Sequence, residues 1–206
     1  EELSNLIRCS ALKMTSKGKS SHIGSILSCA DILAVLYADI INLRQNDSEQ
    51  EKDHFILSKG HAAAGLYACL SHLNLIDKDL LETHYQDGSV LSGHVSHKFS
   101  ENIEVSTGAL GHGLPISCGI ALRSKIRGNL SRTFCLMSDG ELDEGSNWEA
   151  FLFANHHNLN NLTIIIDRNN LQSITTTEKT LKLEPLNEKI LSFGLKVIYC
   201  DGHDHK

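Results

Sequence analysis

Two polar elements of the sequence contain the residue types that bind a hard cation together with a phosphate. The first is Ser138-Asp139-Gly140 and the second is Asn169-Asn170, with residues 141–168 between them. A carboxylate and an amide supply oxygen ligands of the kind that Mg²⁺ and Ca²⁺ prefer, and these cations often complete their shells with water and phosphate oxygens. Because only one of the two ligands is charged, the pair would repel a diphosphate less than a cage of several carboxylates would.

Each polar element follows an apolar run, Thr133–Met137 in the first case and Leu162–Asp167 in the second. Both runs are typical of short buried strands in a parallel sheet. In open α/β sheets, ligands bind at the carboxyl ends of the strands, and Gly140 would let the backbone approach a phosphate closely. Ordinary polar turns are the alternative interpretation of these dipeptides. The strand–helix unit predicted between them favours a binding site.

The spacing of these elements resembles the fingerprint of thiamine diphosphate enzymes, with Ser138 where those enzymes usually have glycine. The segment Ser138–Ala150 resembles the transketolase form of that motif. So do Ser20–Gly24, Leu57–Ala62 and Ser106–Gly113, which occur in the order found in that family. The chain is therefore similar to the diphosphate-binding half of a transketolase. The resemblance is strongest to small transketolase-like proteins that are split into two polypeptides.

The resemblance implies the parts of a cofactor site. It implies that the cation, Mg²⁺ or Ca²⁺, is held by Asp139, Asn169 and the backbone carbonyl of Leu171. The cofactor-binding residues that it implies are His61, Gly108, Leu110, Asp139, Gly140 and Asn169. Within that set, the Gly108 backbone would meet the aminopyrimidine and Leu110 would pack near the cofactor rings.

Three histidines are candidates for catalysis, because each lies beside glycine or serine in a loop: His22, His61 and His94. Singly, each could equally be a surface or core histidine. The resemblance implies that His22 and His94 face the sugar and its proton transfers, and that His61 reaches substrate and diphosphate. It also implies that His112 lies near the reacting carbon.

For one glutamate and for two further histidine features, a functional role competes with a simpler structural interpretation. Glu144 matches a glutamate that lies at the subunit interface in the resembled family, but an acid at a helix N-terminus would also favour the helix dipole. The pair His94-x-x-His97 lacks a third zinc ligand and a helical context, so zinc is not expected. His203 could lie near the site or in an exposed turn.

The function implied is transfer of a two-carbon ketol unit between sugars or sugar phosphates, with thiamine diphosphate and Mg²⁺ or Ca²⁺ as cofactors. The resemblance places the activating glutamate in a separate pyrimidine-binding domain, so a partner subunit is expected, in a heterotetramer with two copies of each. Two alternatives use the same cofactor, a 1-deoxyxylulose-phosphate-synthase-like enzyme and a subunit of an oxo-acid decarboxylase. A non-catalytic assembly or regulatory subunit is the alternative of another class.

Composition supports an enzyme of the cytoplasm. The net charge of −6 over 206 residues provides no basic stripe for nucleic acid. Neither a run of 18 apolar residues nor a signal-like start is evident, so we expect neither membrane insertion nor export. The six cysteines form no Cys-x-x-Cys pair, which suits buried thiols in a reducing compartment.

The alternation of elements predicts an α/β fold, a doubly wound and mostly parallel sheet with helices on both faces. We expect one thiamine diphosphate-binding domain over 1–206, incomplete at its C-terminus. The predicted helices are a first one containing Leu3, Leu6, Ile7, Ala11 and Met14, then 28–40, 60–73, one that begins at Pro115, 146–158, and a short one that Pro185 opens. The predicted strands are 55–57, 133–137, 162–167 and 195–200.

Overall fold

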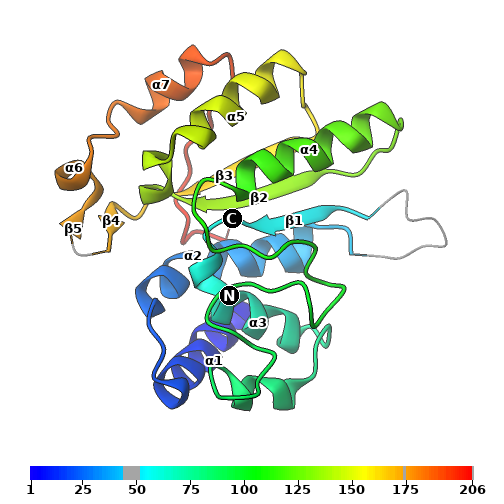
Figure 1. The fold of residues 1–206 in the computed structure, drawn as a ribbon, viewed down its shortest axis with the longest axis vertical. Coiled ribbons are helices and arrows are strands. Elements are labelled where there is room, and N and C mark those ends of the chain that lie inside the picture. Colours follow the sequence, from blue (N-terminus) through cyan, green and yellow to red (C-terminus); the bar gives the residue numbers. More distant parts are fainter. Residues whose placement is uncertain (44–51, 174, 206) are drawn as a thin grey trace. The chain divides into compact units, whose positions relative to one another are not determined.

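The computed structural model of the protein describes residues 1–43, 52–173 and 175–205. Its elements are coloured along the chain in Figure 1. The chain divides into two compact units. Unit 1 comprises Glu1–Ile41, Lys59–Gly108 and Asp201–Lys206. Unit 2 comprises Asn42–Ser58 and Ala109–Cys200. The expectation of a single domain over the whole chain stays a prediction.

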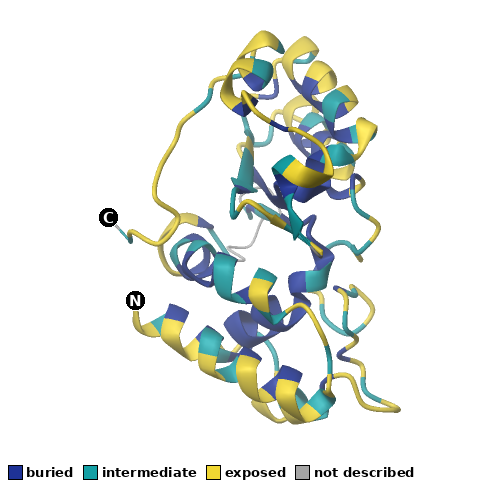
Figure 2. Cartoon of the chain, turned by 90° about the vertical axis from the view of Figure 1, so that its left-hand side faces the viewer, coloured by how far each residue is buried: buried dark blue, intermediate teal, exposed yellow. Residues whose placement is uncertain are grey.

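Unit 1 is helical. Its elements are α1 (Glu2–Gly18), α2 (Ile23–Val35), the π-helical turn η1 (Leu36–Ile40), the 3₁₀ turn η2 (Gly60–Ala62), α3 (Ala63–His72) and the 3₁₀ helix η3 (Lys78–Thr83). The α1 helix is amphipathic, because Ile7, Ala11 and Met14 recur at helical spacing and are buried. Buried and exposed positions alternate along it in Figure 2. Both α1 and α2 pack against α3.

The α3 helix is the centre of this unit, since all residues from Ala63 to Ser71 are buried. Gly65 lets α3 approach α2 closely. A Cβ atom built on Gly65 would lie 2.9 Å from Cγ2 of Ile26 and 3.5 Å from Cδ1 of Leu33. The absence of a side chain at Gly65 is therefore a packing requirement of the helix pair.

One helical stretch, Ile23–Ile40, is apolar enough by length and composition to cross a membrane, with a mean hydropathy of 1.7. The stretch contains Asp31 and Asp39, so it is not an unbroken run of 18 apolar residues, which the sequence lacks. Within the protein 44% of it is buried, and it carries the buried carboxylate of Asp31. The core helix of a globular protein has the same profile, so the stretch is weak support for a membrane span.

Unit 2 contains a three-stranded parallel sheet in the order β1-β2-β3. The strands are β1 (His54–Leu57), β2 (Thr133–Ser138) and β3 (Leu162–Asp167). All six residues of the central strand β2 are buried, which explains the unbroken apolar run Phe134–Met137 within it. The predicted α/β class with a parallel sheet is confirmed, and the strands predicted at 55–57, 133–137 and 162–167 form.

Helices cover this sheet and complete its core. They are α4 (Gly113–Ile126), which packs on β1, β2 and β3, together with α5 (Gly145–His156) and α7 (Leu186–Ser192). Their buried side chains form one hydrophobic core with β2. The remaining elements of the unit are the 3₁₀ turn η4 (Gly140–Asp143), the paired strands β4 (Leu171–Gln172) and β5 (Thr175–Thr176), and α6 (Thr177–Thr180).

Two predicted helix starts and one predicted strand were wrong. The second helix begins at Ile23 rather than at residue 28, and Pro115 is the third residue of α4 rather than the first. The predicted strand 195–200 does not form. Leu195 and Val197 do pack partly buried against the core of unit 2, as alternation suggested. A strand also needs a hydrogen-bonded neighbour, and none of the described sheet pairings involves this segment.

Candidate functional site

The two predicted metal-binding elements lie side by side at the carboxyl ends of β2 and β3. The parallel register pairs Ser138 with Asp167, the last residues of the two strands. The backbone N–H of Asp139 donates to the carbonyl oxygen of Asp167 at 3.2 Å. Asp139 follows β2 directly and Asn169 follows β3 after one intervening residue. The sheet therefore brings both polar elements to one edge, as the sequence predicted.

Asp139 is a buried carboxylate, 0% exposed, with a fixed orientation. Its Oδ1 accepts a hydrogen bond from the backbone N–H of Gly140 at 2.8 Å. Its Oδ2 accepts from the backbone N–H of Asn170 and from Nη1 of Arg168, each at 2.8 Å. A buried charge needs such partners, because burial without them is costly. These bonds also hold the carboxylate plane in one direction.

The motifs in the sequence did not identify Arg168 as a site residue, although it directly precedes the predicted metal ligand Asn169. Its side chain is 17% exposed and joins Asp139 to three other groups. Nη1 lies 2.8 Å from Oγ1 of Thr177, while Nη2 lies 3.1 Å from Oε1 of Glu178 and 2.9 Å from Oε1 of Glu184. Burial opposes the charge, but the hydrogen bonds with Glu184 and Asp139 outweigh it and raise the pKa of Arg168.

The oxygen atoms gathered here fit a hard cation and a diphosphate. Oδ1 of Asn169 accepts from the N–H of Leu171 at 2.9 Å, and an amide oxygen has a second lone pair for a metal. Carboxylate, amide and carbonyl oxygens form the ligand class of Mg²⁺ and Ca²⁺. A Cβ at Gly140 would lie 3.1 Å from Cγ of Gln172, a tight contact that the Gln172 side chain would have to relieve. No group of three or more His, Cys, Asp or Glu among the described residues could hold a metal.

Glu141 is a second buried carboxylate that the sequence did not single out. It is 0% exposed, and its Oε1 accepts from the hydroxyl of Ser58 at 2.5 Å and from the N–H of Gly111 at 2.9 Å. The hydroxyl of Ser146 donates to the carbonyl of the same glycine at 2.6 Å. Gly111 has φ 79°, a conformation that favours glycine. Glu141 thus anchors the glycine loop to the strand ends.

This anchored loop presents two other predicted residues. His112 is exposed, with Nδ1 3.0 Å from the carbonyl oxygen of Leu110. Glu144 is exposed at the N-cap of α5. A Cβ at Gly111 would lie 2.6 Å from Cβ of Glu144, so the loop backbone passes close to this glutamate. The roles of Leu110, His112 and Glu144 stay predictions.

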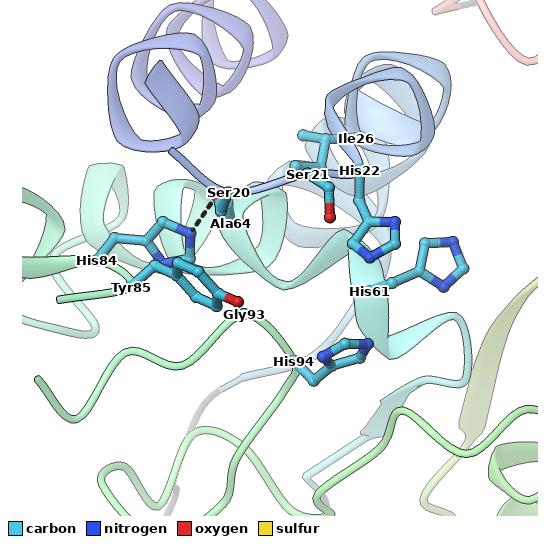
Figure 3. Close-up of a pocket in the computed structure, with 10 residues that line it drawn as sticks. All are labelled: Ser20, Ser21, His22, Ile26, His61, Ala64, His84, Tyr85, Gly93 and His94. Atoms are coloured by element: carbon cyan, nitrogen blue, oxygen red, sulfur yellow. Dashed lines mark hydrogen bonds between the residues drawn. The ribbon is translucent and has the colours of Figure 1, made fainter. Parts of the chain in front are cut away.

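The three loop histidines predicted for catalysis come together in unit 1. The ring centroids of His22 and His61 are 5.1 Å apart, and those of His22 and His94 are 5.7 Å apart. Figure 3 shows the three rings on one side of a pocket. His22 is the N-cap residue of α2 and has φ 73°, in the left-handed region. Nε2 of His61 lies 2.9 Å from Oγ of Ser25.

The environment of this histidine group keeps one of its rings neutral. Burial, and secondarily the electrostatic effect of the nearby His94 ring, lowers the pKa of His22. A neutral imidazole can accept a proton at one nitrogen and donate at the other. The predicted Gly108 passes close to this group, since a Cβ there would lie 3.0 Å from Cδ2 of His94. The group is therefore suited to move protons near a bound ligand.

The other wall of the pocket contains residues that no motif in the sequence identified as part of a site. His84 is 2% exposed, its Nε2 lies 3.3 Å from Oγ of Ser20, and burial lowers its pKa. Tyr85 has φ 57°, which is rare for a bulky residue. Its ring lies against Gly93, where a Cβ would be 2.8 Å from Cε2 of the tyrosine. Both residues line the pocket in Figure 3.

Two histidines of open role have other partners. Nδ1 of His97 lies 2.7 Å from the hydroxyl oxygen of Ser106. Nδ1 of His203 lies 2.8 Å from Oδ2 of Asp31, a buried carboxylate that Arg8 also binds. His203 therefore takes part in an ion-pair group of unit 1, and His97 is not among the residues that line the pocket.

Comparison with known proteins decides the family. The model of the transketolase thiamine diphosphate-binding domain matches residues 1–206. The chain belongs to the transketolase family. It is 44% identical to one subunit of the apulose-4-phosphate transketolase of Actinobacillus succinogenes, over 89% of this chain and 67% of that protein. It is 34% identical to one subunit of a 6-deoxy-6-sulfo-D-fructose transketolase of Clostridium sp., over 97% of this chain and 73% of that protein.

Solved transketolases share the fold of this transketolase-family chain. The transketolase of Campylobacter jejuni matches with a TM-score of 0.89 and 32% identity, over 99% of this chain and 33% of that one. The transketolase of Leishmania mexicana matches with a TM-score of 0.86 and 30% identity, over 99% and 32% respectively. The chain thus spans about two thirds of the Actinobacillus protein and about a third of these longer transketolases. The resemblance predicted from the motifs is confirmed. The chain is a transketolase-like transferase domain, and it belongs to a family of thiamine diphosphate-binding domains.

Proposed function

We propose that this chain is the diphosphate-binding part of a thiamine diphosphate- and Mg²⁺-dependent transketolase that transfers a two-carbon ketol unit between sugars or sugar phosphates. The observation that carries the proposal is the buried, oriented Asp139 carboxylate beside Asn169 at two adjacent strand ends. Two relatives named as subunits of apulose-4-phosphate transketolases support the same assignment. Like those proteins, it would act with a partner, here a pyrimidine-binding subunit, in a heterotetramer with two copies of each, in the cytoplasm.

Unit 2 would hold the metal and the diphosphate. Asp139, the amide oxygen of Asn169 and the carbonyl of Leu171 would ligate Mg²⁺, or Ca²⁺ in its place. The backbone at Gly140, which has no Cβ, would let the diphosphate approach closely, while its N–H keeps Asp139 in place. When bound, thiamine diphosphate supplies the carbanion chemistry that cleaves and re-forms a carbon–carbon bond of the sugar. The protein's task in this unit is to bind and orient the cofactor.

Unit 1 would handle the protons of the sugar. His22 and His94 would hydrogen-bond the ketose hydroxyls and carbonyl, taking up or returning a proton as the bond is broken and formed. The lowered pKa of His22 supports this role, because a neutral ring is available as a base at neutral pH. His61, held by Ser25, would contact both substrate and diphosphate. His112 would lie near the reacting carbon, and Glu144 would contact the second subunit.

The test removes the charged metal ligand. We expect Asp139→Ala, in the full-length protein assembled with its partner subunit, to lose most of its Mg²⁺-dependent affinity for thiamine diphosphate, because no other carboxylate is among the proposed ligands. Calorimetric titration with thiamine diphosphate, with Mg²⁺ and with a chelator, measures this loss.

Asp53→Ala is the matched control. Asp53 is also a buried aspartate paired with an arginine, Arg132, but that pair lies at the amino ends of the strands. Its removal should lower thermal stability and leave cofactor affinity unchanged. Equal affinity of parent and Asp139→Ala, with the control intact, would show that Asp139 is not the metal ligand and would remove the proposal.

A further inference from the structure

The arginine that contacts the proposed metal ligand has an unusual set of partners for a charged residue at a strand end. Arg168 spans from the buried carboxylate of Asp139 to Thr177, Glu178 and Glu184. All these residues belong to unit 2. A guanidinium group has donors in a rigid fork, so it can fix several acceptors at once, unlike the flexible ammonium of lysine.

The glutamates are themselves held by the backbone. Oε1 of Glu178 accepts from the N–H of Leu183 at 3.1 Å, and Oε2 of Glu184 accepts from the N–H of Leu186 at 2.9 Å. Thr177 is fully buried. The arginine therefore connects Asp139 to the whole segment Thr177–Leu186 rather than to one mobile side chain.

The charges in this network permit a cation to bind nearby. A lone arginine 2.8 Å from Oδ2 of Asp139 would repel a divalent cation at the same carboxylate. Here Glu178 and Glu184 carry two negative charges against the single positive charge of Arg168, so the network apart from Asp139 is negative. The arginine can then orient the carboxylate while the surrounding charge still favours a cation.

We propose that Arg168 is a positioning residue of the metal site, which orients Asp139 for the cation while Glu178 and Glu184 balance its charge. This inference rests on the proposed function, because it takes Asp139 as a metal ligand. It extends the site to the segment Thr177–Leu186, which none of the motifs in the sequence marked. Groups that hold a metal ligand in place commonly change metal affinity 10- to 100-fold when they are removed.

The decisive variant is Arg168→Met, which keeps much of the side-chain volume and removes the guanidinium. The measurement is the Mg²⁺ concentration that gives half-maximal binding of thiamine diphosphate, at a temperature where the variant is folded. It uses the full-length protein assembled with its partner subunit. We expect this concentration to rise roughly 10- to 100-fold. Arg168→Lys should give a smaller rise, because lysine keeps the positive charge and can still donate to one acceptor, although an ammonium group cannot span them all.

A second variant separates charge from geometry. Glu184→Gln keeps a hydrogen-bond acceptor at a half-exposed side chain but removes its negative charge. We expect it to raise the Mg²⁺ requirement at low salt, with less effect at high salt, because screening weakens the lost attraction. Its melting temperature should stay near that of the parent. This variant decides the question if Arg168→Met does not fold.

Arg132→Met is the matched control, since Arg132 also binds a buried aspartate of unit 2, Asp53, at 2.6 Å. It should lower the melting temperature without changing the Mg²⁺ requirement. Mg²⁺ binding by Arg168→Met that equals or exceeds that of the parent would overturn the inference, since the arginine would then be irrelevant or a competitor of the cation. A parent that binds neither Mg²⁺ nor thiamine diphosphate would overturn the proposed function itself, and the inference with it.

Discussion

Histidine side chains have distinct surroundings in unit 1, and those surroundings predict distinct effects of mutation. His94 is exposed and contributes to the ring group with His22. His97 lies three residues further along the same loop and is hydrogen-bonded to Ser106 instead. Neither side chain fills a hydrophobic core, so truncation of either leaves no core cavity. The two positions therefore form a matched pair that separates catalysis from folding.

We expect His94→Ala, in the assembled enzyme, to lower the rate of ketol transfer by about 10²- to 10⁴-fold, the usual contribution of a positioned acid or base. Its melting temperature and its affinity for thiamine diphosphate should stay those of the parent. Steady-state rates and melting curves measure both. His97→Ala should keep the parent rate. A normal rate in His94→Ala, or an equal loss in both variants, would remove the catalytic assignment of His94.

At the scale of secondary structure, helix packing in unit 1 positions the histidine loops. His61 lies in η2 directly before α3, and His22 caps the N-terminus of α2. The close approach of α2 and α3 at Gly65 therefore sets how these two loops meet. A side chain at this glycine would contact Cγ2 of Ile26, a β-branched group whose rotamer cannot easily change.

Gly65→Ala should destabilise the protein. Overpacking a core contact costs roughly 1–3 kcal/mol, which exceeds the gain of up to about 1 kcal/mol from replacing glycine in a helix. Gly119→Ala is the contrasting change, because Gly119 lies exposed in α4 and a Cβ there would meet no atom of the described residues within 4 Å. Denaturant unfolding should show lower stability for the first variant and equal or higher stability for the second. Higher stability of Gly65→Ala would contradict the packing described for α2 and α3.

At the scale of the whole molecule, the chain covers part of what its relatives contain. It spans about a third of the longer transketolases, and relatives that it matches over two thirds of their length are named as subunits. The groups of unit 2 would bind a diphosphate and a metal, and those of unit 1 would handle protons. The carboxylate that activates the aminopyrimidine is expected on a partner subunit.

We therefore expect the protein that carries this chain to bind thiamine diphosphate by itself more weakly than with its partner, and to show no ketol transfer alone. Adding the pyrimidine-binding subunit should restore turnover, and size-exclusion chromatography with light scattering should show two copies of each chain. A rate assay with a ketose donor and an aldose acceptor, run on the separate subunits and on their mixture, measures this. Full activity without the partner would show that the enzyme is not split in this way.

The family, the parallel sheet and the place of two polar elements at neighbouring strand ends could be predicted from the sequence alone. These are local properties: apolar runs fix β2 and β3, and the polar residues that follow a strand must lie at its end. Asp139 and Asn169 were predictable because parallel neighbouring strands end at the same edge. The loop histidines were recognisable from small neighbouring residues and from the order of motifs.

Which distant side chains meet could be seen only in the folded protein. Two contacts join segments that are far apart in the chain: the ion pair of Arg168 with Asp139 and the hydrogen bond from Gly111 to Glu141. No local sequence pattern predicts such contacts. The strained backbone of Tyr85 is equally invisible in a sequence. The predicted strand 195–200 was wrong for the same reason. Local alternation sets which side chains are buried, whereas a strand, like a buried charge, exists only when packing supplies its partner.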